Sequence, residues 1–200
     1  EWLLIDQFKE PSEIQNYLRD LIRIHIPQQL GFDPLTEVQV ISPTHRGLLG
    51  TKEINRMLQY LHHGPVEGRF TIGDRVVQKA NDYNLEIFNG SLGTVRAIDK
   101  EGILIDFDLE GERLIPTDKS AALQLAYCLT IHSMQGSEAP CVVLLLHKSH
   151  WHACRQLVYT GVTRARKTLI LLGDRWGIRQ AVKNQRASQR RTLLPLWASK

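Results

Sequence analysis

The chain has 200 residues, of which 42% are hydrophobic and 23% charged, and these ordinary globular values exclude a wholly disordered protein. The longest apolar run, 142–146, is too short to span a bilayer, so no membrane segment is expected. Three cysteines without a CxxC pair exclude a disulfide scaffold and indicate a reducing compartment, so the protein is expected to be cytoplasmic.

The formal net charge of +4 is unevenly distributed along the chain. Residues 1–163 hold 15 Lys and Arg against 20 Asp and Glu, whereas residues 164–200 hold 10 against one. This segregation indicates either a nucleic-acid or phosphate partner near the C-terminus or a solvated basic tail. Because the chain begins at Glu1 rather than Met, a piece of a longer protein is also expected.

The first part of the chain alternates between strand and helix patterns. An apolar run at 2–5 predicts a buried strand, and Ser12 is the expected N-cap of a helix that ends at Pro27. A second strand is predicted at 38–41, followed by a helix around 54–61. This order predicts an α/β layer built on a parallel sheet.

The pattern changes after residue 65. Four short β-prone runs are separated by turn-forming residues: 75–78, 93–98, 103–107 and 112–115. Such spacing is typical of a small antiparallel barrel inserted into the α/β domain.

The α/β pattern resumes at Leu123. Its predicted elements are strands at 127–131, 141–146 and 168–172, a helix at 154–162 and a basic helix from about Gly177. We therefore expect three segments: 1–66 and 119–200 form one domain with a basic C-terminal tail, and 67–118 form the barrel.

One candidate for chemistry is the segment from Thr130 to Glu138, which follows a buried strand. Polar residues at the carboxyl end of a strand, with Gly136 allowing close backbone approach, suit contact with phosphate or nucleic acid. An ordinary strand-to-helix turn explains the same pattern.

The second candidate is the segment 157–167, in which Arg164 leaves a helix just before the last strand. A guanidinium there can reach a triphosphate bound against a neighbouring domain and stabilise charge during phosphoryl transfer. A basic residue that complements the helix dipole is the alternative.

Together these segments resemble known motifs. Residues 130–138 resemble motif V of superfamily 1 DNA helicases, and residues 157–166 resemble motif VI. Residues 38–55 are similar to the motif IV region of the RecD-like group (exodeoxyribonuclease V alpha-chain-like), and residues 73–93 are similar to its inserted SH3-like barrel. The resemblance runs from about residue 2 to residue 196.

The resemblance implies a fold and an activity. The fold is the second RecA-like motor domain, of the P-loop NTPase type but without its own P-loop, interrupted by the SH3-like β-barrel. The activity is that of an ATP-dependent DNA helicase moving 5′ to 3′ on single-stranded DNA.

The resemblance also implies roles for individual residues. Arg164 would be the arginine finger and the catalytic residue. The implied ATP-binding residues are Gln135, Gly136, Glu138 and Arg164. The implied DNA-binding residues are Arg46, Thr130, His132, Ser133 and Asn89.

The sequence departs from the family pattern at two points. Ser133-Met134 stand where the group usually has Lys-Ser, so a cationic phosphate contact is missing from this motif. No GxxxxGK[ST] loop and no strand ending in paired acids occurs in the 200 residues. The chain alone is therefore not expected to hydrolyse ATP, and ATP and Mg²⁺ would be held mainly by a preceding motor domain.

The partners implied are single-stranded DNA, that preceding domain, and nuclease or other helicase subunits. Two alternatives stay open: a free-standing single-stranded nucleic-acid-binding module, and an adaptor subunit of a nuclease complex.

A histidine and cysteine group and two aromatic residues are further candidates for sites. His147, His150, His152 and Cys154 fit no zinc spacing, so no metal is expected. Phe88 is expected in the barrel core, while Tyr83 is a candidate for an exposed aromatic residue near DNA.

Overall fold

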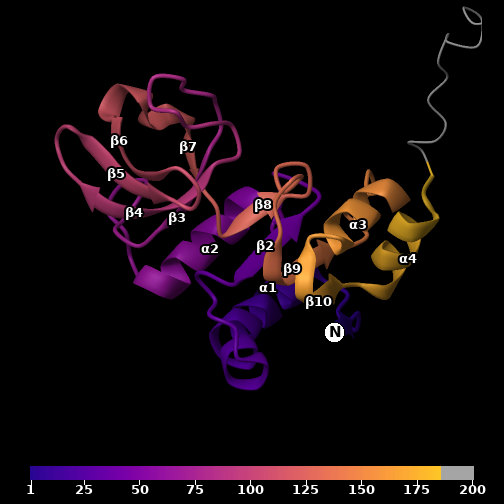
Figure 1. The fold of residues 1–200 in the computed structure, drawn as a ribbon. Helices are drawn as coiled ribbons and strands as arrows, with labels where there is room; N and C mark the ends of the chain where they lie inside the picture. The colour runs from indigo at the N-terminus through magenta and orange to yellow at the C-terminus, as the bar shows by residue number, and fades with distance from the viewer. Residues whose placement is uncertain (186–200) are drawn as a thin grey trace, which may run out of the picture.

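The computed structural model describes residues 1–185, which form two sheets with helices packed around the first (Figure 1). The first sheet is parallel throughout, in the order β1-β10-β9-β2-β8. Its strands are β1 (Trp2–Ile5), β2 (Val38–Ser42), β8 (Cys128–Thr130), β9 (Ala139–Leu146) and β10 (Ala165–Gly173). The predicted α/β fold with a parallel sheet is confirmed, and the part of the expected basic tail at 186–200 lies outside the described residues.

Strand β9 is the centre of this sheet, and its sequence explains why. Residues 142–146 are an unbroken apolar run with at most 1% exposure. A central strand of a parallel sheet has both faces covered and needs apolar side chains on each. Val143 and Leu145 belong to one hydrophobic core, whereas Val142 and Leu144 belong to the other.

The helices cover both faces of the first sheet. They are α1 (Pro11–Asp20), the π-helix η1 (Leu21–Leu30), α2 (Thr51–His63), α3 (Arg155–Val162) and α4 (Arg175–Lys183). Apolar side chains of α1, η1 and α2 build the first core, and those of α3 and α4 build the second. None of the helices within residues 1–185 is long and apolar enough to cross a membrane.

The boundaries predicted for the first helix were wrong at both ends. The N-cap is Glu10 rather than Ser12, because Pro11 occupies the first turn and the Glu13 carboxylate accepts from the backbone N–H of Glu10 at 3.1 Å. The helix also does not end at Pro27, since a π-helical segment carries the chain to Leu30. Wider π-helical turns accommodate the missing N–H of the proline.

The second sheet is antiparallel, in the order β6-β5-β4-β3-β7. Its elements are β3 (Arg75–Gln78), β4 (Leu92–Ile98), β5 (Gly102–Phe107), β6 (Gly111–Pro116), the 3₁₀ helix η2 (Thr117–Ala122) and β7 (Leu123–Leu125). Leu123 was predicted to restart the α/β pattern, but it pairs with Gln78 of β3 instead. The second sheet thus extends beyond residue 118, because β7 completes its core with the fully buried Leu123.

A buried polar network joins the two sheets. Asp74, just before β3, has no exposed surface and accepts hydrogen bonds from the Tyr127 hydroxyl at 2.7 Å and the Gln59 amide at 2.6 Å. His63 Nε2 lies 3.0 Å from the same hydroxyl. Because Gln59 and His63 belong to α2, the network fixes the second sheet against the helix that borders the candidate site.

Candidate functional site

The carboxyl ends of β2 and β8 lie side by side at one edge of the first sheet. The two strands are parallel neighbours, and Ser42 is opposite Thr130. The loop 43–50 and the turn 131–138 therefore leave the sheet next to each other, at the end where open α/β sheets bind ligands. This places Arg46 and Thr130, two of the predicted DNA-contact residues, at the same end of the sheet.

Thr130 and Ser133 form a pair of hydroxyls where the turn begins. Their oxygens are 2.9 Å apart, and the Ser133 backbone N–H donates to Thr130 Oγ1 at 3.2 Å. Ser133 Oγ also accepts from Lys79 Nζ at 3.0 Å. Lys79 directly follows β3, so a cation from the second sheet reaches the predicted DNA contact.

Lys79 is the residue of this site that sequence reasoning missed. It lies 54 positions before Ser133, and a single lysine after a short strand forms no motif. The one available signal was indirect: the helicase-like motif lacks its own lysine, so a cation from elsewhere could occupy the place.

A groove of about 820 Å³ lies between α2 and the second sheet, next to these hydroxyls. We call it the basic groove. Its cationic lining residues are Arg46, Lys52, Arg56, Arg69 and Lys79. Within the described part of the chain its lining contains no Asp or Glu, so the groove offers positive charge to an anion.

Several cations of the basic groove are free of carboxylates. Arg46, Lys52 and Arg56 are exposed, and none of them forms an ion pair within residues 1–185. Lys52 and Arg56 are four residues apart on α2 and so share one helix face. Arg69 is held by the carbonyl of Leu123 at 2.8 Å. The cations thus come from α2, from the loop before it and from residues bordering the second sheet.

Arg164 lies where α3 ends and β10 begins, and its side chain connects both candidate segments. The guanidinium donates to the Thr160 carbonyl at 3.1 Å, the Ser137 carbonyl at 3.2 Å and the Thr163 hydroxyl at 3.1 Å. The Arg164 carbonyl in turn accepts from the backbone of Ala139 at 3.0 Å. All three acceptors of the guanidinium are neutral, so its charge keeps no carboxylate partner within the described residues.

Gly161 allows α3 to pack closely on the first sheet. A Cβ at this position would lie 3.2 Å from Ile41 and 3.3 Å from Leu144, tighter than most side-chain contacts. The glycine therefore sets the depth at which α3 sits, and with it the position of Arg164 one turn further on.

The other predicted nucleotide contacts lie on the same turn. Gly136 has φ +87°, a conformation that favours glycine, and both Gly136 and Gln135 are exposed. The carboxylate of Glu138 pairs with Arg166 at 3.1 Å, with both side chains largely exposed. The turn thus presents Gln135, Gly136 and Glu138 close to the Ser137 carbonyl that Arg164 contacts.

Two predicted DNA contacts make no side-chain bond to the hydroxyl pair within residues 1–185. His132 is exposed, and its ring forms no hydrogen bond or ion pair with the described residues. Asn89 is exposed on the loop that covers the end of β3, where its backbone N–H donates to Asn81 at 2.8 Å. The expectation that Phe88 is a core residue was wrong: it is 48% exposed and meets Tyr83 edge to face.

The histidine group before α3 has structural contacts. His147 Nε2 lies 3.1 Å from the Lys9 carbonyl, and His152 Nε2 lies 2.9 Å from the Pro43 carbonyl. Among the described residues no group of three His, Cys, Asp or Glu is arranged to hold a metal ion. Burial raises the pKa of the Cys141 thiol to about 11 and raises that of Cys128 as well, which makes both poor nucleophiles.

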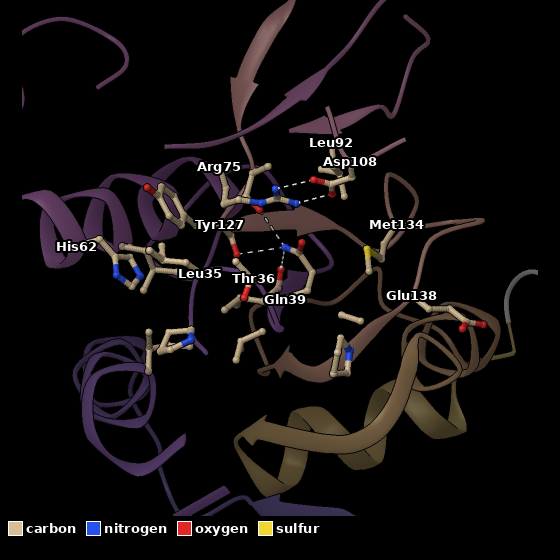
Figure 2. Close-up of a pocket in the computed structure, with 18 residues that line it drawn as sticks. Leu35, Thr36, Gln39, His62, Arg75, Leu92, Asp108, Tyr127, Met134 and Glu138 are labelled. Carbon is tan, nitrogen blue, oxygen red and sulfur yellow. Dashed lines mark hydrogen bonds and ion pairs between the residues drawn. The ribbon is translucent and has the colours of Figure 1, made fainter. Parts of the chain in front are cut away.

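A small cavity of about 90 Å³ lies at the junction of the two sheets, on the side of Glu138 (Figure 2). Arg75 and Asp108 both line it and are joined to each other in a bidentate ion pair with distances of 2.9 and 2.7 Å. Below them the amide of Gln39 donates to the carbonyls of Ala126 and Tyr127, both at 3.1 Å. These internal bonds make the cavity part of the joint between the sheets.

Comparison with known proteins places these segments in a family context. Residues 125–172 match the family model described as "UvrD-like helicase C-terminal domain". The ATP-dependent RecD2 DNA helicase of Deinococcus radiodurans is 40% identical over 170 residues, covering 78% of this chain and 23% of the relative. The RecBCD enzyme subunit RecD of Haemophilus influenzae is 36% identical over 119 residues, covering 57% of this chain and 18% of the relative. The resemblance to RecD-like helicases is confirmed, and the chain spans about a quarter or less of these relatives.

Solved structures agree at the level of the fold. A structure described as the structural basis for DNA unwinding at forked double-stranded DNA by two coordinating Pif1 helicases superposes with a TM-score of 0.56 at 19% identity, covering 88% of this chain and 50% of that one. The Bacteroides Pif1 helicase solved with ADP-AlF3 and single-stranded DNA superposes with a TM-score of 0.53 at 15% identity, covering 82% of this chain and 49% of that one. The mixed α/β fold with its parallel sheet is thus similar to that of Pif1 helicase motor domains.

Proposed function

We propose that this chain, a homologue of the RecD-like superfamily 1 helicases, is the second motor domain of an ATP-dependent DNA helicase. The observation that supports this most is the contact of the Arg164 guanidinium with the Ser137 carbonyl. It joins the end of α3 to the turn 131–138 in one site, as cooperation of the two helicase-like motifs requires.

In this proposal Arg164 is the arginine finger. A preceding motor domain holds ATP and Mg²⁺ and presents the γ-phosphate across the interface. The guanidinium, whose acceptors within residues 1–185 are all neutral oxygens, exchanges one of them for a phosphate oxygen and stabilises the charge that develops during transfer. Gln135, Gly136 and Glu138 complete the nucleotide side of the interface from the same turn.

Single-stranded DNA is the proposed second ligand. Thr130 and Ser133 offer hydroxyls to the phosphate backbone, and Arg46 lines the basic groove beside them. His132 and Asn89 are proposed as contacts at the margin of this path. Because the turn 131–138 carries both the hydroxyl pair and the nucleotide contacts, closure on ATP and opening on hydrolysis would alter the grip on DNA.

The second sheet is proposed to be the SH3-like barrel that the resemblance implies, with β7 as its last strand. Its buried joint to α2 gives it a fixed position beside the groove. Nuclease or other helicase subunits are proposed as further partners of the longer protein.

Unwinding assays test the proposal on the longer protein that carries this chain and a P-loop domain. We expect ATP-dependent unwinding of duplexes with a 5′ single-stranded tail and none with a 3′ tail. The isolated chain is expected to bind single-stranded DNA in a salt-sensitive manner and not to hydrolyse ATP. Unwinding only from 3′ tails would contradict the proposed 5′-to-3′ direction.

A free-standing single-strand-binding module is the second candidate function, since the basic groove is formed entirely within this chain. That function predicts salt-sensitive DNA binding that ATP does not alter in the longer protein. The helicase proposal predicts that affinity changes between the ATP-bound and nucleotide-free forms.

A further inference from the structure

We infer that Lys79, from the inserted second sheet, supplies the phosphate-binding cation at the hydroxyl pair Thr130–Ser133. A residue of the second sheet and two residues of the first sheet thus bind the same phosphate of single-stranded DNA. This inference rests on the proposed function and adds to it a residue that lies outside all of the helicase-like motifs.

The geometry is the first support for this inference. Lys79 Nζ lies 3.0 Å from Ser133 Oγ, and Ser133 Oγ lies 2.9 Å from Thr130 Oγ1. Ser133 Oγ is thus within hydrogen-bond distance of both the ammonium and the second hydroxyl, and the three groups form a compact set of donors. A phosphate oxygen that meets this set accepts bonds from both sheets at once.

The backbone of Lys79 is fixed, so its position does not depend on the DNA. Its N–H donates to the Ala122 carbonyl at 2.8 Å, and the preceding residue, Gln78, bonds to Ser91 and Gly90. The side chain is half-buried, while the turn that it contacts is exposed at His132 and Gln135. A cation held in this way is preorganised for binding.

The charge of Lys79 is not used elsewhere. No carboxylate lies within 4.0 Å of its ammonium in the part of the chain that the structure describes. By contrast, Lys119 is paired with Asp82. Within residues 1–185 the Lys79 ammonium is hydrogen-bonded only to the neutral Ser133 hydroxyl, so its charge is available to an anion.

The surroundings favour a polynucleotide over a single free phosphate. Lys79 lines the basic groove together with Arg46, Lys52 and Arg56. The groove therefore offers several cations from separate elements beside Lys79, which suits the successive phosphates of a nucleic-acid strand.

The inference is tested with the whole 200-residue chain, a fluorescent oligothymidylate and a titration at several salt concentrations. We expect Lys79→Ala to weaken binding roughly tenfold at low salt, the usual effect of losing one charged hydrogen bond. The slope of log K against log salt should fall by about 0.7, the value for one phosphate contact on a single strand. Lys100→Ala is the matched control, because Lys100 is an exposed lysine of the same sheet outside the groove.

A second set of variants separates charge from structure. Lys79→Arg should keep the affinity for DNA. The double variant Lys79→Ala/Ser133→Lys should regain affinity relative to Lys79→Ala, because it places the cation on the turn after β8 of the first sheet. Lys79→Gln replaces Lys79→Ala as the test variant if Lys79→Ala changes the circular dichroism spectrum or the melting temperature. An unchanged salt slope in a folded Lys79 variant, with Arg46→Ala and Arg56→Ala still weakening binding, would overturn this inference and leave the proposed function intact. Absence of salt-sensitive binding by the unmodified chain would contradict both.

Discussion

The hydroxyl of Tyr127 donates to Oδ1 of Asp74 at 2.7 Å, and through this contact the two sheets are joined by a fully buried carboxylate. Burial raises the pKa of the Tyr127 phenol, and its hydrogen bond to Asp74 raises the pKa further. The phenol therefore stays protonated and remains a donor at neutral pH. The orientation of the second sheet beside the basic groove depends on this pair.

Removing either partner is expected to destabilise the protein. Tyr127→Phe should lower the free energy of unfolding by about 1–2 kcal/mol, because Asp74 loses a donor while it stays buried. Asp74→Ala should lower it by about 3 kcal/mol, because three groups lose their acceptor: the Tyr127 hydroxyl, the Gln59 amide and the Thr71 N–H. Denaturant titration measures both changes. Tyr60→Phe, at a tyrosine that is 65% exposed, is the control and should change stability by less than about 0.5 kcal/mol.

Gly161→Val is expected to lower the free energy of unfolding by about 1–3 kcal/mol. The added side chain meets Ile41 and Leu144, so α3 must shift away from the sheet. Tyr159→Val on the same helix, at a position 69% exposed, is the control. Equal stability of the two variants would show that α3 does not depend on close packing at this glycine.

Glu138→Gln should separate stability from nucleotide binding. Its ion pair with Arg166 is largely exposed, so its loss should change the unfolding free energy by less than about 1 kcal/mol. In the longer protein the same change should weaken the binding of ATP, because Glu138 is proposed to face the nucleotide. A loss of stability with unchanged ATP affinity would assign Glu138 a structural role only.

Acid should destabilise the protein through His150. Burial, together with nearby His147 and His152, lowers the pKa of His150 to about 4, while Asp174 acts in the opposite direction. The unfolded chain, with a histidine pKa of about 6.5, binds the proton more tightly than the folded chain. This contribution to stability is therefore complete above about pH 6.5 and is lost as the pH falls toward about 4, by up to about 1.4 kcal/mol per pH unit.

The measurement for His150 is the unfolding free energy as a function of pH. His150→Gln should flatten the curve between about pH 6.5 and 4. His132→Gln, which changes an exposed histidine, should leave the curve unchanged. A curve that is equally steep in both variants would assign the acid sensitivity to other groups.

Local patterns in the sequence predicted most of the first sheet. Residues 142–146 are apolar on both faces, and only the centre of a covered sheet suits such a strand. The turn after Thr130 and the helix before Arg164 were predicted as separate segments, and the structure joins them through Ser137. That contact depends on the parallel packing of β9 and β10, which brings Ala139 beside the backbone of Arg164.

Local patterns failed where distant residues decide the structure. Leu123 carries no mark that assigns it to the second sheet, and its pairing with Gln78 follows from the core that it completes. Phe88 was expected inside because of its hydrophobicity, but the loop turns it outward against Tyr83. Lys79 was missed because its importance arises from a contact between the two sheets.

The central claim is that this domain supplies Arg164 to ATP bound by its neighbour. The most direct test is the steady-state rate of DNA-stimulated ATP hydrolysis by the longer protein carrying Arg164→Ala, with Arg164→Lys alongside and the exposed Arg179→Ala as control. We predict that Arg164→Ala lowers the rate by about 10³-fold while the protein stays folded and single-strand affinity is unchanged, with only the modest fall in melting temperature expected from losing its three hydrogen bonds. Arg164→Lys should restore little of the rate, and Arg179→Ala should behave as wild type. A folded Arg164→Ala protein that hydrolyses ATP at the wild-type rate would contradict the account.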